Sequence, residues 1–317
     1  MRIVFCGSGQ VATATLAALR GAEHGLELVL TQPPRPAGRG GKVTPTPVAE
    51  AAEALGLRAL PCANINEPSE VERIRSVRPE AIVVVDFGQK IGREVRDLAV
   101  HGAINMHASL LPALRGAAPI NWAIIRGLHH TGVTTFRLVD RMDAGPILLQ
   151  EAVEIGHEET AEALRDRLAA LGAQVVLRTL AGLDGGTLCD QPQNEDLATT
   201  APKLTKADGR IDFADSALSV VNRIRGTWPW PGAHAAFVHD GRPPVRVIIA
   251  EAAAMLTGEP NPAAPGTVGD DGAVQTPDGA VAVRRLKVAG KRLMGWNDFV
   301  NGYRVAPGDR FETVEGD

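Results

Sequence analysis

The chain begins Met1-Arg-Ile-Val-Phe-Cys-Gly-Ser-Gly-Gln-Val-Ala12, an apolar run that leads directly into a glycine-rich turn. Arg2–Cys6 has the length and the Val and Ile content of a buried strand. The turn is followed by Val11–Leu19, which carries apolar residues at helical spacing. A strand, a tight turn and a helix in this order predict the first unit of a doubly wound α/β sheet.

The same alternation continues through the first part of the chain. Further buried strands are predicted at Leu26–Thr31, Ala81–Val85, Ala103–His107, Gly132–Val139 and Ile147–Ile155. Helices are predicted at Pro47–Leu55, Glu70–Val77 and Thr160–Leu183. Strands that alternate with helices are joined by right-handed crossovers, so we expect a mostly parallel, doubly wound sheet.

The pattern changes after residue 186. Residues 187–208 are polar, contain Pro192 and Pro202 and show no helical period, which is typical of a linker. An amphipathic helix follows at Ser216–Arg225. Short strands are then predicted at Ala233–Val238, Val245–Ala250, Gly266–Val268 and Ala280–Lys287. Short strands at this spacing favour a small β-barrel of the kind related to OB folds. We therefore expect a catalytic domain at 1–186, a linker at 187–208 and a barrel domain at 209–317.

Composition limits the function classes. A chain of 317 residues suits two domains, and its net charge of −4 argues against a surface coated in basic residues for nucleic acid. No apolar stretch reaches the ~18 residues that a membrane span needs, and the start does not resemble a signal peptide. Cys6, Cys62 and Cys189 lie far apart, which supports neither a disulfide framework nor a zinc site. We expect a cytoplasmic protein without a metal.

The glycine-rich turn matches the dinucleotide-binding fingerprint, with Ala12 in third place. That fingerprint also needs an acidic residue at the end of the second strand. Here the strand ends Leu30-Thr31-Gln32, which contains no carboxylate. A tight turn between strand and helix explains the glycines without a cofactor. An NAD(P)-binding oxidoreductase is therefore kept only as an alternative from another class.

The residues Ile104-Asn-Met-His-Ala-Ser-Leu-Leu-Pro112 carry the strongest chemical signal. Asn105 and His107 are two apart at the C-terminal end of a predicted strand, so their side chains point to the same side. Ligands bind beyond such strand ends in open α/β sheets. An imidazole can take a proton from an attacking amine, and both groups can donate to a developing oxyanion. A structural His beside a turn-forming Asn is the alternative.

A second strand, within Gly132–Pro146, ends in Asp143 and a glycine turn. A carboxylate there can orient His107 and stabilise its protonated form, as in a catalytic triad. Asp140 is the other candidate for this role, and either residue can instead cap a turn.

The Asn-x-His-x-Ser-Leu-Leu-Pro run, Arg115-Gly-Ala-Ala-Pro119, Thr131-Gly-Val-Thr and Met142-Asp-Ala-Gly145 resemble the folate-dependent formyltransferase family. The resemblance implies that Asn105, His107 and Asp143 form the catalytic set and that 10-formyltetrahydrofolate is the formyl donor. It also implies a reduced-folate site built from Val85, Asp86, Phe87, Gly88, Gln89, Ser109, Leu110, Leu111 and Pro112. Asp86 is a departure from the family pattern and brings an extra carboxylate near the folate ring.

The acceptor amine separates the branches of this family. Thr31–Gly40 resembles a loop that enters a tRNA acceptor stem, and the stretches 201–206, 210–212 and 224–231 resemble the linker and barrel of the same branch. The implied acceptor is the amino group of the initiator methionyl-tRNA, and the implied role is in translation initiation. The tRNA would contact Arg35, Arg39, Lys42, Lys203, Lys206 and the barrel domain of a monomer.

Other acceptors stay open at this point. Met142-Asp-Ala-Gly-Pro146 is nearer to the glycinamide ribonucleotide branch of the family. A formyltransferase for a small amine or a nucleotide sugar, a formyl-folate hydrolase and a noncatalytic tRNA-binding module are the remaining alternatives.

Overall fold

The computed structural model describes residues 1–22, 24–37 and 41–314. The chain forms two compact units. The N-terminal unit comprises residues 1–116, 131–154 and 165–201, and the C-terminal unit comprises 117–130, 155–164 and 202–317. The predicted domain limits at 186, 187–208 and 209 remain predictions. None of the described helices is both long and apolar enough to cross a membrane.

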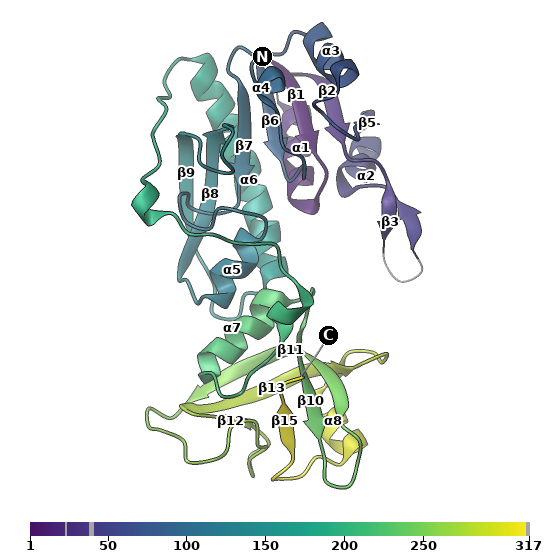
Figure 1. Cartoon of the computed structure of the whole chain (residues 1–317), viewed down its shortest axis with the longest axis vertical. Coiled ribbons are helices and arrows are strands. Elements are labelled where there is room, and N and C mark those ends of the chain that lie inside the picture. The colour runs from purple at the N-terminus through teal and green to yellow at the C-terminus, as the bar shows by residue number, and fades with distance from the viewer. Residues whose placement is uncertain (23, 38–40, 315–317) are drawn as a thin grey trace. The chain divides into compact units, whose positions relative to one another are not determined.

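A sheet of seven described strands forms the centre of the N-terminal unit, in the order β5-β2-β1-β6-β7-β8-β9 (Figure 1). β1 pairs in parallel with β2 and β6, β2 with β5, and β6 with β7, whereas β7 and β8 are antiparallel. This confirms the predicted mostly parallel, doubly wound sheet. The strands are β1 Arg2–Gly7, β2 Gly25–Thr31, β5 Ala59–Pro61, β6 Ala81–Val85, β7 Ala103–His107, β8 His130–Arg137 and β9 Ile147–Glu154.

Helices connect these strands, and their apolar faces are buried. Helix α1 turns Ala12, Leu16 and Leu19 into the core. Helix α2 begins after Thr46, whose side chain accepts a hydrogen bond from the backbone N–H of Ala49. The helices that begin in this part of the chain are α1 Gln10–Gly21, α2 Pro47–Ala54, α3 Pro68–Ser76, α4 Arg93–Arg96, α5 Pro119–Ile125 and α6 Ala161–Asp184.

The C-terminal unit is built on an antiparallel sheet in the order β12-β13-β11-β10-β15, with β14 beside β13. Residues 266–268 lie between the two edge strands: Thr267 bridges to Arg310 of β15, and Val268 bridges to Val274 of β12. This closes the sheet and confirms the small barrel. The elements are α7 Ala217–Thr227, β10 Ala233–Val238, β11 Val245–Leu256, β12 Val274–Thr276, β13 Gly279–Val288, β14 Met294–Gly295, α8 Trp296–Tyr303 and β15 Arg310–Glu312.

Aromatic rings fill one part of the barrel interior. The ring of Phe237 lies 5.1 Å from that of Phe299 and 5.2 Å from that of Phe311, measured between centroids. The three side chains are buried, and Val247, Ile249 and other aliphatic residues continue the same cluster. This core is separate from the cluster that packs around β1, β2 and β6 in the N-terminal unit.

Helix α5 belongs to the C-terminal unit, because it packs against α7. The side-chain amide of Asn121 donates to the carbonyl of Gly226 at 2.8 Å. A Cβ at Gly226 would lie 2.6 Å from the Ile125 side chain, so the close approach of the two helices requires glycine there. The sequence did not indicate this packing, since the two helices are about a hundred residues apart.

Candidate active site

Asn105 and His107 lie in β7, which is flanked by β6 and β8. His107 is buried, and its Nε2 lies 2.9 Å from the carbonyl oxygen of Leu114. A carbonyl only accepts, so this hydrogen bond places the proton on Nε2 and leaves Nδ1 as the proton acceptor. The structure thus holds the imidazole in one orientation at the C-terminal end of β7.

The loop after β7 is held by buried polar contacts. Ser109 is fully buried, and its hydroxyl donates to the carbonyl of Ala113 at 2.7 Å. The Thr134 hydroxyl donates to the carbonyl of Ser109 and accepts from the N–H of Leu111. Gln150 donates to the carbonyl of Leu111 and to Thr134 Oγ1. In this structure the polar groups of Ser109 and Leu111 shape the loop itself. Leu110 and Pro112 lie in the same loop, half buried.

Asp143 reaches this loop from the turn after β8. Its Oδ2 accepts a hydrogen bond from the backbone N–H of Gly116 at 2.8 Å, two residues beyond Leu114. Asp143 has a φ of 51°, in the left-handed region that Asp adopts more readily than most residues. Gly145 follows, where a Cβ would lie 1.7 Å from the carbonyl oxygen of Arg137. Asp143 and His107 are therefore linked through the 114–116 backbone rather than by a direct hydrogen bond.

Asp140, the other carboxylate considered for orienting His107, has a different partner. Its Oδ1 lies 2.5 Å from a guanidinium nitrogen of Arg96, and its side chain is 80% exposed. Arg96 itself is buried. This pairing gives Asp140 a structural role and leaves Asp143 as the carboxylate that contacts the loop beside His107.

A further set of polar residues holds the loop after β7, and the sequence pattern did not indicate these contacts. Arg115 is buried and donates to Gln193 and, through two nitrogens, to Glu195. Gln193 donates in turn to the carbonyls of Asp143 and Gly145, at 2.8 and 2.7 Å. The hydrogen bonds from Arg115 hold the pKa of Glu195 below its usual range. Residues 191–201 thus tie the loop after β7 to the turn after β8.

The expected folate segment, residues 85–89, follows β6. Val85 and Phe87 are buried in the core. Gln89 accepts from the N–H of Ile65 and donates to the carbonyl of Cys62, which fixes the neighbouring loop. Gly88 has a φ of 73° and lies against Gln32. Asp86 and Gly88 are therefore the members of this segment that present exposed surface.

Asp86 lies directly over the glycine-rich turn. A Cβ at Gly9 would fall 1.6 Å from Asp86 Oδ2, and the backbone carbonyl of Asp86 accepts from the N–H groups of Ser8 and Gly9. Desolvation raises the pKa of Asp86. A dinucleotide needs its pyrophosphate close to this glycine and to the start of the helix. A carboxylate already occupies that space, which disfavours the NAD(P)-binding alternative.

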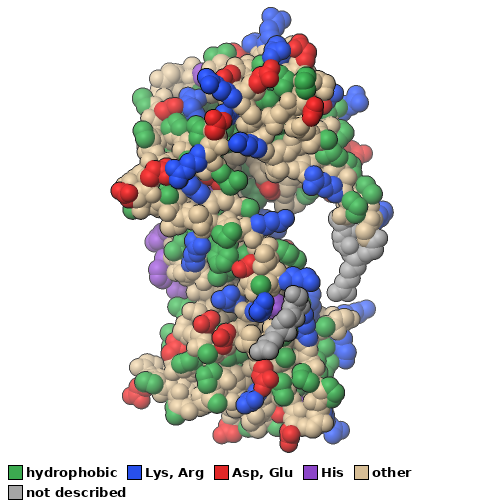
Figure 2. Space-filling model, in the orientation of Figure 1, with side chains coloured by type: hydrophobic (Ala, Val, Ile, Leu, Met, Phe, Trp, Pro, Cys, Tyr) green, Lys and Arg blue, Asp and Glu red, His purple; other side chains and the backbone are tan. Residues whose placement is uncertain are grey.

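The residues expected to contact tRNA lie in two places. Arg35 and Lys42 are exposed on β3 Arg35–Ala37 and β4 Lys42–Thr44, an antiparallel hairpin that projects away from the sheet (Figure 1). Arg39 lies outside the described residues. Lys203 and Lys206 are exposed in the C-terminal unit, with Lys206 at the start of the 3-10 helix η2 Lys206–Gly209. Figure 2 shows Lys and Arg side chains on the surface of each unit, with Asp and Glu among them.

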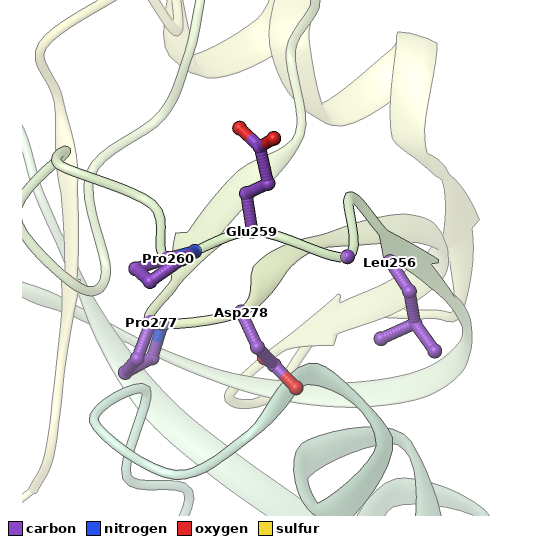
Figure 3. Close-up of a pocket in the computed structure, with 6 residues that line it drawn as sticks. Leu256, Glu259, Pro260, Pro277 and Asp278 are labelled. Atoms are coloured by element: carbon purple, nitrogen blue, oxygen red, sulfur yellow. The ribbon is translucent and has the colours of Figure 1, made fainter.

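A cavity of about 390 Å³ lies in the C-terminal unit (Figure 3). It is lined by Leu256, Gly258, Glu259, Pro260, Pro277 and Asp278. The Asp278 carboxylate accepts from the N–H of Ala217 at the start of α7 and from the Thr276 hydroxyl, so it stabilises the helix start. Within the described ranges, no group of three His, Cys, Asp or Glu side chains is placed to hold a metal ion.

The family follows from comparison with known proteins. The family model described as "Formyl transferase" matches residues 1–180, and "Formyl transferase, C-terminal domain" matches residues 203–304. The chain therefore belongs to the formyl transferase family, whose members transfer a one-carbon formyl group. The methionyl-tRNA formyltransferase of Solibacter usitatus is 41% identical over 98% of this chain and 98% of its own length. That of Acidobacterium capsulatum is 40% identical over 98% and 99%.

Solved structures show the same fold at lower identity. WlaRD, a sugar 3N-formyl transferase, matches with a TM-score of 0.64 and 14% identity over 92% of this chain and 99% of its own. HypX from Aquifex aeolicus, solved in complex with tetrahydrofolic acid, matches with a TM-score of 0.59 and 18% identity. That match covers 96% of this chain and 47% of HypX. The predicted fold and the predicted formyl-transfer class are confirmed.

Proposed function

We propose that this protein transfers the formyl group of 10-formyltetrahydrofolate to the amino group of the initiator methionyl-tRNA, for translation initiation in the cytoplasm. The observation that carries the proposal is the placement of Asn105 and His107 at the C-terminal end of β7, with Asp143 bound to the loop that His107 also contacts. The names of the relatives, which match over nearly the full chain, support methionyl-tRNA as the acceptor.

The amine nitrogen attacks the formyl carbon, and a tetrahedral intermediate forms. The Asn105 amide donates to its oxyanion, which is the usual role of a preorganised donor in acyl transfer. His107 receives the proton of the amine at Nδ1, because Nε2 already donates to Leu114. The bond from carbon to N10 of the folate then breaks, and His107 returns the proton to that nitrogen directly or through water. The products are the formylamide and tetrahydrofolate.

Asp143 is a positioning residue in this scheme. It holds Gly116, and its charge favours the protonated imidazole that forms during the reaction. The folate would lie along residues 85–89 and the loop 109–112, with the exposed Asp86 and Gly88 nearest to it. We further propose that Arg35, Arg39, Lys42, Lys203 and Lys206 contact tRNA phosphates and that the enzyme acts as a monomer.

The proposal is tested by incubating the protein with 10-formyltetrahydrofolate and charged initiator tRNA. We expect formylmethionine to be released when the tRNA is deacylated afterwards. Reactions without donor, and with deacylated tRNA, are the controls and should yield none. Release of free formate at the same rate with and without tRNA would support the formyl-folate hydrolase instead.

A further inference from the structure

The loop between α7 and β10 carries an exposed indole. Trp230 is 55% exposed and is the one aromatic residue among the large apolar side chains that the structure describes as exposed. The other tryptophans have partners or partial cover: Trp122 donates to the carbonyl of Pro202, and Trp296 stacks on Phe299. An exposed indole offers a flat, apolar face on which a nucleotide base can stack.

The loop is held in place by backbone contacts. The N–H of Gly232 donates to the carbonyl of Thr227 at 3.0 Å and closes the turn that carries Trp230. Gly232 has a φ of 82° and lies against Gly209. A Cβ at Gly209 would lie 2.3 Å from the carbonyl oxygen of Gly232. The N–H of Ile211 donates to the carbonyl of His234. The segment that carries Lys206 therefore runs beside the end of the loop that carries Trp230.

The chain segment that includes this loop carries a net positive charge. Residues 201–232 contain five basic and three acidic side chains, whereas the whole chain has a net charge of −4. Lys203 and Lys206 are exposed. The Asp208 carboxylate is engaged by the N–H and hydroxyl of Thr205, and Asp212 accepts from the N–H of Ala214. Asp215 lies 3.9 Å from Arg223.

An exposed aromatic face combined with exposed cations is the usual arrangement for binding an unpaired nucleotide. We propose that Trp230 stacks on an unpaired base of the tRNA while Lys203 and Lys206 contact the adjacent phosphates. This inference rests on the proposed function and adds a base-stacking site in the C-terminal unit to it. Stacking tolerates any base, so the site supplies affinity and position rather than sequence readout.

The test compares three variants in the full-length protein. Trp230→Ala should raise the KM for methionyl-tRNA about 5- to 100-fold, the range for loss of one base–aromatic stack. Trp230→Phe keeps a ring and should recover most of that loss. Leu218→Ala is the matched control, since Leu218 is 51% exposed in α7 of the same unit and lies outside the proposed site. The KM for the formyl-folate donor should stay at the wild-type value in all three variants.

A second readout separates this inference from the proposed function. Deacylated initiator tRNA should quench the intrinsic fluorescence of the wild type, and Trp230→Phe should remove most of that change while binding persists. If the wild type formylates methionyl-tRNA and Trp230→Ala has the same KM, the stacking inference is wrong and the function stands. If the wild type does not formylate but tRNA quenches Trp230, the function is wrong and the stacking site stands. If the wild type neither formylates methionyl-tRNA nor is quenched by tRNA, both the proposed function and the stacking site are wrong.

Discussion

His107 and Asp143 hold the same turn from two sides: the His107 Nε2 donates to the carbonyl of Leu114 at 2.9 Å, and the Asp143 carboxylate accepts from the N–H of Gly116 at 2.8 Å. Leu114 and Gly116 both have positive φ, 60° and 126°. The two side chains therefore stabilise an unusual backbone, and the backbone in turn fixes the ring orientation. A change at Asp143 is expected to reach the imidazole through this turn.

Asp143→Asn separates the charge of this residue from its hydrogen bond. The amide oxygen can still accept from Gly116, but it cannot stabilise a protonated imidazole. We expect normal folding and a fall in kcat on the order of 10²–10⁴-fold, the range for acid–base assistance. Asp140→Asn is the matched control and should change only its pairing with Arg96. A larger loss in Asp140→Asn than in Asp143→Asn would show that Asp140, and not Asp143, supports His107.

Asn105→Ala removes the proposed oxyanion donor. Since Asn105 lies within β7 and is only half buried, the strand should keep its pairing with β6 and β8. We expect kcat to fall by roughly 10²–10³-fold with little change in the melting temperature. Turnover within a few-fold of the wild type would exclude the oxyanion role.

The hairpin residues Arg35 and Lys42 are both exposed. If both contact phosphates, Arg35→Ala and Lys42→Ala should each raise the KM for methionyl-tRNA. Each should also lower the slope of log affinity against log salt by about 0.7–0.9. Arg58→Ala, at an exposed cation outside the hairpin, should leave the slope unchanged. Identical salt dependence in wild type and hairpin variants would indicate that these cations contact no tRNA.

Most of the α/β frame was predictable, because its strands are continuous apolar runs that local pattern reveals. β7 and the shared face of Asn105 and His107 followed from the spacing of two residues in a strand. The contacts of Arg115, Gln193 and Asp143 could not be predicted from the sequence. They join residues 27 to 80 positions apart, and the segment that carries Gln193 is polar and has no helical or strand period. The hairpin at 35–44 was expected as a loop, because its proline and glycine content hides the β3–β4 pairing.

Asp86→Asn tests the carboxylate over the glycine-rich turn. Desolvation raises the pKa of Asp86 above that of an aspartate in the unfolded chain, so the folded state binds this proton more tightly. Stability is therefore lost as the pH rises from the unfolded pKa through the folded one. Asp86 keeps exposed surface, so we expect a modest effect.

Asn avoids this loss and also tolerates the φ of 45° at this position. We expect Asp86→Asn to melt above the wild type at pH 7–8, with the difference shrinking towards pH 4. Asp240→Asn, at an exposed position in a turn, is the control. A lower melting temperature for Asp86→Asn at neutral pH would mean that the carboxylate stabilises the turn.

The three cysteines should differ in reactivity. Cys6 and Cys62 are buried, and desolvation raises the pKa of both, that of Cys62 to about 11. Cys189 is exposed. A thiol reagent at pH 8 should therefore label one cysteine in the native protein and three in denaturant, because only the thiolate reacts. Rapid labelling of Cys6 in the native state would contradict its place in the β1 core.

Competition between acceptor amines identifies the substrate of this enzyme. The protein is given formyl-labelled 10-formyltetrahydrofolate with equal concentrations of initiator methionyl-tRNA, free methionine, glycinamide ribonucleotide and an amino-sugar nucleotide. We predict that the label enters methionyl-tRNA and is recovered as formylmethionine after mild alkaline deacylation. Label found instead in one of the small amines, with none in the tRNA fraction, would contradict the account.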